Sequence, residues 1–138
     1  MSIENFKGWR AYEISLPDGG KIICFYFINH GQDVTLYDEN HNIFRLDKEG
    51  NVMWQIQREE NGKFIWEVAH QQAREKGLDG ERRPFGSLRL FNAQDEWLQS
   101  VDAWHPGLKL ITICHGIYEI DIDKGVANNV TPISWRDW

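Results

Sequence analysis

Two cysteines and five histidines are the residues of this sequence that could bind a metal ion or serve as nucleophile and base. Cys114 and His115 are adjacent, so on a strand their side chains point to opposite faces and cannot bind one ion together. His30 and His41 flank two aspartates, but their spacing is not that of a helical face and no second ligand pair accompanies them. The sequence therefore predicts no metal site and no cofactor.

Catalytic motifs are absent as well. No serine lies in a G-x-S-x-G elbow, and Gly19 and Gly20 belong to a hairpin turn instead of a phosphate-binding loop. A pair such as His105 and His115 could act as acid and base in RNA hydrolysis, but the formal charge of -6 repels that substrate. We therefore expect a protein that is not an enzyme.

The acidic residues are more informative than the nucleophiles, because their spacing is ordered. Acids recur at every second position from 119 to 123, which places them on one face of a strand. Other acids, at 95, 96 and 102, alternate with tryptophans. Aromatic rings beside carboxylates suit a partner rich in lysine and arginine, because the rings anchor it while the acids steer it. The predicted partner-binding residues are Asp95, Glu96, Trp97, Asp102, Trp104, Glu119, Asp121 and Asp123.

An alternative interpretation stays open for these residues. Trp97 and Trp104 could belong to the core, with the nearby acids as ordinary solvated side chains, because one sequence does not distinguish buried from exposed aromatics. The acidic balance argues against nucleic acid as a partner. The longest apolar run, 22–28, is too short to cross a membrane, so no membrane partner is expected. A polar start and only two cysteines favour a cytoplasmic protein.

Short strands and turns must position these residues. Alternating apolar runs separated by glycine-rich turns predict an all-β fold, or β with one short helix, of about eight to ten strands. A chain of 138 residues fits a single β-rich domain, 1–138, built as an antiparallel meander that forms a curled sheet, a sandwich or a barrel. Within this domain, the apolar run at 21–28 predicts a strand that is buried on both faces. Gly50 is predicted to be a turn residue with a left-handed backbone conformation.

Other segments carry weaker signals. Val52, Trp54 and Ile56 alternate with polar neighbours and predict one apolar face, followed by a third strand at 63–68. Helix-forming residues at 68–76 before Gly77 predict a two-turn helix. Strands are expected again at 87–91, 97–101, 108–113, 117–122 and 130–135.

Two motifs resemble small stand-alone bacterial β-proteins. The first is N-I-F-R-L-D-K-E-G-N-V-M-W-Q-I at 42–56, and the second is the Y-E-I-D strand at 118–121. Several proteins with this pattern are similar to immunity proteins of contact-dependent inhibition and related toxin systems. The resemblance covers about a third of the chain, and the excursion at 70–86 departs from it.

The resemblance implies a non-catalytic binding protein. The expected partner is a cognate toxin domain with a basic surface, such as a nuclease, neutralised by stoichiometric masking. The alternative is a β-barrel that binds or hydrolyses a small ligand in an aromatic-lined pocket, which a deep apolar cavity would favour. The oligomeric state and the identity of the toxin are not determined by the sequence.

Overall fold

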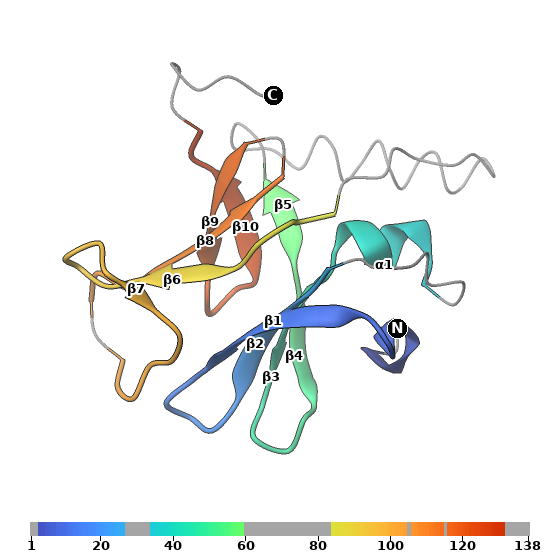
Figure 1. Cartoon of the computed structure of the whole chain (residues 1–138), viewed down its shortest axis with the longest axis horizontal. Helices are drawn as coiled ribbons and strands as arrows, with labels where there is room; N and C mark the ends of the chain where they lie inside the picture. Colours follow the sequence, from blue (N-terminus) through green and yellow to red (C-terminus); the bar gives the residue numbers. More distant parts are fainter. Residues whose placement is uncertain (1–2, 27–33, 60–83, 105, 115, 132–138) are drawn as a thin grey trace.

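The computed structural model describes residues 3–26, 34–59, 84–104, 106–114 and 116–131. Over these residues the chain forms ten strands in two sheets, with a 3-10 turn η1 (Ile3–Phe6) and one five-residue helix α1 (Leu36–Asn40) (Figure 1). The predicted fold class, an all-β domain of about eight to ten strands, is confirmed. The described strands do not close into a barrel.

The first sheet is an antiparallel meander. It contains β1 (Arg10–Ser15), β2 (Lys21–Tyr26), β3 (Ile43–Leu46) and β4 (Val52–Gln55) in that order. Ile22 and Cys24 of β2 face one side of the sheet, and Ile23 and Phe25 face the other; all four side chains are buried. The prediction of a two-sided central strand is therefore confirmed.

The second sheet has six strands and one parallel pair. Its order is β5 (Gln57–Glu59), β10 (Val126–Asn129), β9 (Ile117–Asp121), β8 (Lys109–Ile113), β6 (Arg89–Phe91) and β7 (Trp97–Leu98). Strand β5 runs parallel to β10, with Ala127 beside Arg58, whereas all other pairs are antiparallel. The meander predicted from the sequence did not include this parallel pair.

A single residue joins the two sheets along the chain. Ile56 lies between β4 and β5, is completely buried, and donates its N–H to the carbonyl of Ile43. The chain thus leaves the first sheet and enters the second without a loop (Figure 1). The apolar face predicted for this segment is only partly correct, since Val52 is 41% exposed and Trp54 partly buried.

The hydrophobic core lies between the two sheets. Ile14, Ile22 and Ile43 of the first sheet share one buried cluster with Leu110 and Ile120 of the second. A smaller cluster covers the opposite face of the first sheet, where Phe6 of η1 packs on Phe25 and Phe44. Both faces of the first sheet are therefore covered, whereas in the described part of the chain only one face of the second sheet is part of a buried cluster.

A buried asparagine ties the segment before β6 to the first sheet. Asn42, with no exposed surface, accepts the N–H of Phe85 on Oδ1 at 2.9 Å and donates Nδ2 to the carbonyl of Phe85 at 2.8 Å. Its Nδ2 also donates to the carbonyl of Phe25 at 2.6 Å. The side-chain amide thus supplies hydrogen bonds to the backbone that a neighbouring strand would otherwise supply.

Some expected elements differ from the structure or lie outside it. Helix α1 was not predicted, although Thr35 supplies a capping signal and accepts the N–H of Asp38 at 3.1 Å. The strand expected at 97–101 is limited to Trp97–Leu98, and Val130 and Thr131 follow the last described strand. The segments 63–68, 68–76 and 132–135 lie outside the described residues. No helix among the described residues has the length and hydropathy to span a membrane.

Candidate interaction surface

Five of the eight predicted partner-binding residues lie on one protruding stretch. Residues 92–104, which we call the acidic arm, contain the β6–β7 turn, strand β7 and the loop that follows. The arm carries three acids and neither lysine nor arginine. Asn92 closes the turn, since its Oδ1 accepts the N–H groups of Gln94 and Glu96 at 2.9 Å each. Asp95 takes the left-handed backbone conformation there, with φ of 59°.

Both tryptophans of the acidic arm are on the surface. Trp97 is 60% exposed and Trp104 is 47% exposed, so neither ring belongs to the core. An arginine side chain lies against each ring. The guanidinium carbon of Arg89 is 5.3 Å from the centre of the Trp97 ring, and that of Arg45 is 5.5 Å from the centre of the Trp104 ring. These cation–π contacts restrict the rings before any partner arrives.

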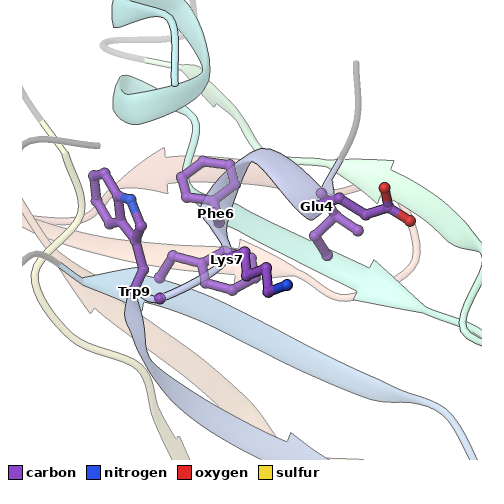
Figure 2. A pocket seen from close by; sticks show the side chains of 7 residues that line it. Glu4, Phe6, Lys7 and Trp9 are labelled. Atoms are coloured by element: carbon purple, nitrogen blue, oxygen red, sulfur yellow. The ribbon is translucent and has the colours of Figure 1, made fainter. Parts of the chain in front are cut away.

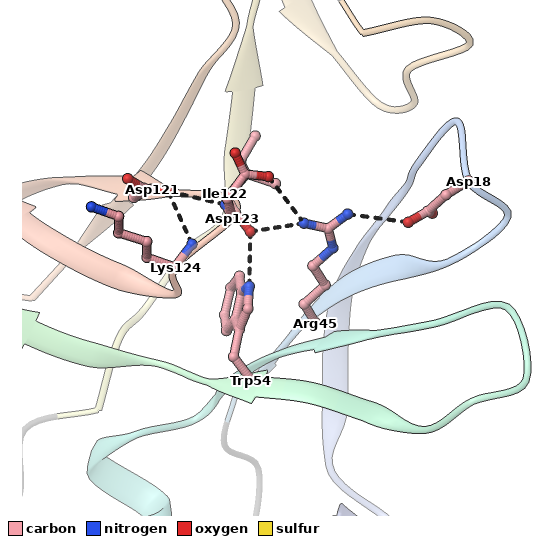
Figure 3. Close-up of polar contacts among 7 residues, drawn as sticks. All are labelled: Asp18, Arg45, Trp54, Asp121, Ile122, Asp123 and Lys124. Carbon is pink, nitrogen blue, oxygen red and sulfur yellow. Dashed lines mark hydrogen bonds and ion pairs between the residues drawn. The ribbon is translucent and has the colours of Figure 1, made fainter.

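Arg45 is the residue that links the acidic arm to both sheets. It extends from β3, is only 7% exposed, and donates Nη1 to the carbonyl of Ile122 at 3.0 Å. Its Nη2 donates to Asp18 at 3.1 Å, and Nη1 lies 3.7 Å from Asp123 (Figure 3). Trp54 donates Nε1 to the same carbonyl of Ile122 at 2.8 Å. Arg45 therefore bridges two turns of the chain beneath the Trp104 ring.

The electrostatics of this junction follow from its contacts. The N–H of Gly20 and, to a smaller extent, Arg45 hold the pKa of Asp18 below its usual value. Asp18 is therefore ionised at neutral pH and neutralises part of the arginine charge. Sequence reasoning did not identify Arg45, because an arginine that alternates with apolar residues in a strand has the same pattern as a solvent-facing one.

The acids of β9 lie on the outer face of the second sheet, with β8 and β6 between them and the acidic arm. Glu119 and Asp121 alternate with buried Tyr118 and Ile120, as predicted, and face away from the core. Strand β9 ends at Asp121, so Asp123 is not the third acid of that face. It lies in the turn beside Arg45 because Oδ1 of Asp121 accepts the N–H groups of residues 123 and 124 and closes the turn. Asp123 is therefore set apart from Glu119 and Asp121, and Lys109 of β8 and Arg89 of β6 lie between those two acids and the acidic arm.

A pocket of about 650 Å³ lies beside η1, on the far side of the first sheet. Phe6, Trp9 and Phe25 contribute apolar wall, and Glu4 and Lys7 contribute charged groups at its border (Figure 2). The rings of Phe6 and Trp9 meet edge to face at 5.2 Å. An aromatic wall with a few polar groups is the composition of small-molecule sites, and the volume lies in their range.

Nucleophilic and metal-binding groups are not assembled in the described part of the chain. Both cysteines are buried, and burial raises the pKa of the Cys24 thiol to about 12. Cys24 is therefore protonated at neutral pH and is not a nucleophile. Among the residues described here, no three histidine, cysteine or acidic side chains gather as metal ligands would.

Comparison with known proteins gives no relative. No family model, curated protein or solved structure matches this chain. Its function is therefore argued from its own residues.

Proposed function

We propose that this protein is a non-catalytic binding protein that masks a basic surface of another protein, as an immunity protein masks a toxin domain. The observation that carries the proposal is the acidic arm, which has two exposed tryptophans, three acids and no basic residue. Tryptophan is enriched among residues that dominate binding energy, and carboxylates around it select cationic partners.

The contacts of the two tryptophans support this role. Arg89 and Arg45 hold the rings in place, so less conformational freedom is lost when a partner covers them. Arg45 is itself fixed by Ile122 and Asp18, which gives Trp104 a rigid base. The net charge of -6 attracts a cationic domain at long range and speeds association.

The test is protection of growth against the toxin domain encoded beside this protein's gene. Cells that express both should grow, and the triple variant Asp95→Lys, Glu96→Lys, Asp102→Lys should lose protection because the arm becomes cationic. The control Glu119→Lys, Asp121→Lys changes the charge by about four units, against about six for the triple variant, and should protect like the native chain. Equal protection by the triple variant would exclude the acidic arm as the binding surface, and protection by neither native chain nor control would exclude the immunity role.

The pocket beside η1 favours a second candidate, the binding of a small apolar ligand. Phe6 and Trp9 supply the aromatic wall that such a ligand would contact. A ligand screen monitored by tryptophan fluorescence should then give a saturable change that Trp9→Leu removes and Trp97→Leu retains. A change that survives Trp9→Leu would show that the ligand binds elsewhere.

A further inference from the structure

The outer face of the second sheet is not part of either buried cluster. Its side chains alternate with the buried residues of β6, β8 and β9 and therefore point away from the core. Ile113 is beside Ile117 on the neighbouring strand, and Val130 donates its N–H to the carbonyl of Ile117. Ile113 and Val130 are each 44% exposed, which is unusual for an apolar group on a sheet. These residues form an apolar strip across the face.

The charges of this face are divided between its two sides. Across the strands, Arg89 of β6 lies beside Ile111 of β8, and Ile111 lies beside Glu119 of β9. The same β8–β9 register continued by one residue places Lys109 beside Asp121. Glu59 of β5 lies on the same face through Asn128 of β10, so the acids are on β9 and β5, the bases are on β6 and β8, and isoleucines lie between and beside them.

A two-fold axis that lies in the interface and runs parallel to the strands brings each acidic side over the basic side of the other copy. We propose that the outer face of the second sheet binds a second copy of this chain in a symmetric dimer. Isologous interfaces require a self-complementary surface, and a face with three acids, two bases and a shared apolar strip meets that requirement. A basic partner is disfavoured at the centre of this face, because Lys109 would repel it. This dimer does not rest on the proposed masking function.

The size of the face predicts a weak dimer. Six strands about 4.8 Å apart, each contributing up to about five residues of about 3.4 Å, give a face of at most roughly 500 Å² in projection. That is at or below the standard interface of about 800 Å² of accessible surface per partner. Monomer and dimer should therefore exchange, with the dimer fraction rising with protein concentration.

Charge reversal on the two sides gives a sharp test. In sedimentation velocity over a concentration series, the native chain should show a monomer–dimer equilibrium. The basic variant Glu119→Lys, Asp121→Lys and the acidic variant Arg89→Glu, Lys109→Glu should each dimerise at least about tenfold more weakly, because like charges face each other. An equimolar mixture of the two should form a heterodimer, since each basic side then faces an acidic one.

Further variants test whether the dimer uses the outer face of the second sheet and not the acidic arm. Asp95→Lys, Glu96→Lys in the acidic arm should dimerise like the native chain, and Ile113→Asp should be monomeric with an unchanged circular dichroism spectrum. If Arg89→Glu disturbs Trp97, Lys109→Glu alone should still weaken the dimer. A native chain that stays monomeric at every concentration would overturn the proposal. So would a dimer that both charge variants retain, or a mixture that does not associate.

Discussion

Replacement of Asn42 with leucine should lower the free energy of unfolding by about 3–5 kcal/mol, because buried backbone groups lose their hydrogen bonds. The amide of Asn42 bonds both the N–H and the carbonyl of Phe85 and also the carbonyl of Phe25. Leucine has nearly the same size, so the loss is one of polar contacts more than of volume. Urea denaturation followed by tryptophan fluorescence measures the change.

Asn92 provides a matched control. Its side chain also makes three hydrogen bonds, to the backbone of Gln94 and Glu96 and to the Glu96 carboxylate, but these bonds are exposed to solvent. Water replaces them in the variant, so Asn92→Leu should cost only about 1 kcal/mol. Equal costs for the two leucine variants would contradict the role assigned to the buried amide.

The variant Asn42→Asp should make stability depend on pH. Burial, together with the carbonyl oxygens of Phe25 and Phe85 that would face the new carboxyl group, raises its pKa in the folded state above the unfolded value of about 3.9. The folded form then binds the proton more tightly than the unfolded form does. The loss in free energy of unfolding relative to the native chain is therefore smallest at low pH. It grows as pH rises through the folded-state pKa. A difference in free energy of unfolding between variant and native chain that does not change with pH would contradict this prediction.

Replacement of Gly125 with alanine should destabilise the protein by about 2–4 kcal/mol, because backbone and packing both oppose a side chain there. Gly125 has a φ of +71°, and a Cβ atom at this position would lie 2.4 Å from Cδ2 of the Trp54 ring. That ring cannot move freely, since its Nε1 is bonded to the carbonyl of Ile122. Thermal and urea denaturation measure the loss.

A variant at Gly50 separates the backbone strain from the steric clash with the ring. It has a φ of +86°, and a Cβ atom there would meet no atom within 4 Å. Gly50→Ala should therefore cost about 1 kcal/mol, the backbone strain alone. In a Trp54→Ala background, Gly125→Ala should fall to the same cost, so the double-mutant cycle should show strong coupling. Additive effects would mean that the ring is not what opposes the alanine.

Local patterns in the sequence were sufficient to predict most of the strands. The alternation around Tyr118 and Ile120, the apolar run of β2 and the left-handed Gly50 all follow from periods of two residues and from turn chemistry. These are properties of neighbouring residues, which the sequence states directly. Helix α1 was missed because one turn capped by Thr35 is too short to show a helical period.

Tertiary structure decided how the strands are divided between the two sheets and which candidate residues lie close together. The passage of the chain between sheets at Ile56, and the parallel pairing that follows it, depend on contacts between distant segments. The exposure of Trp97 and Trp104 depends on what packs against them, and the sequence does not show that an arginine lies against each ring.

The same physical reason explains why basic side chains interrupt the predicted acidic surface. Glu119 and Asp121 looked like part of an acidic face because their own strand carries no base. The register with β8, and through it β6, places Lys109 and Arg89 on that face. Charge on a sheet is a property of neighbouring strands, and strand order is fixed by long-range packing. The sequence alone therefore determined which residues alternate, and only the folded chain decided which charges stand together.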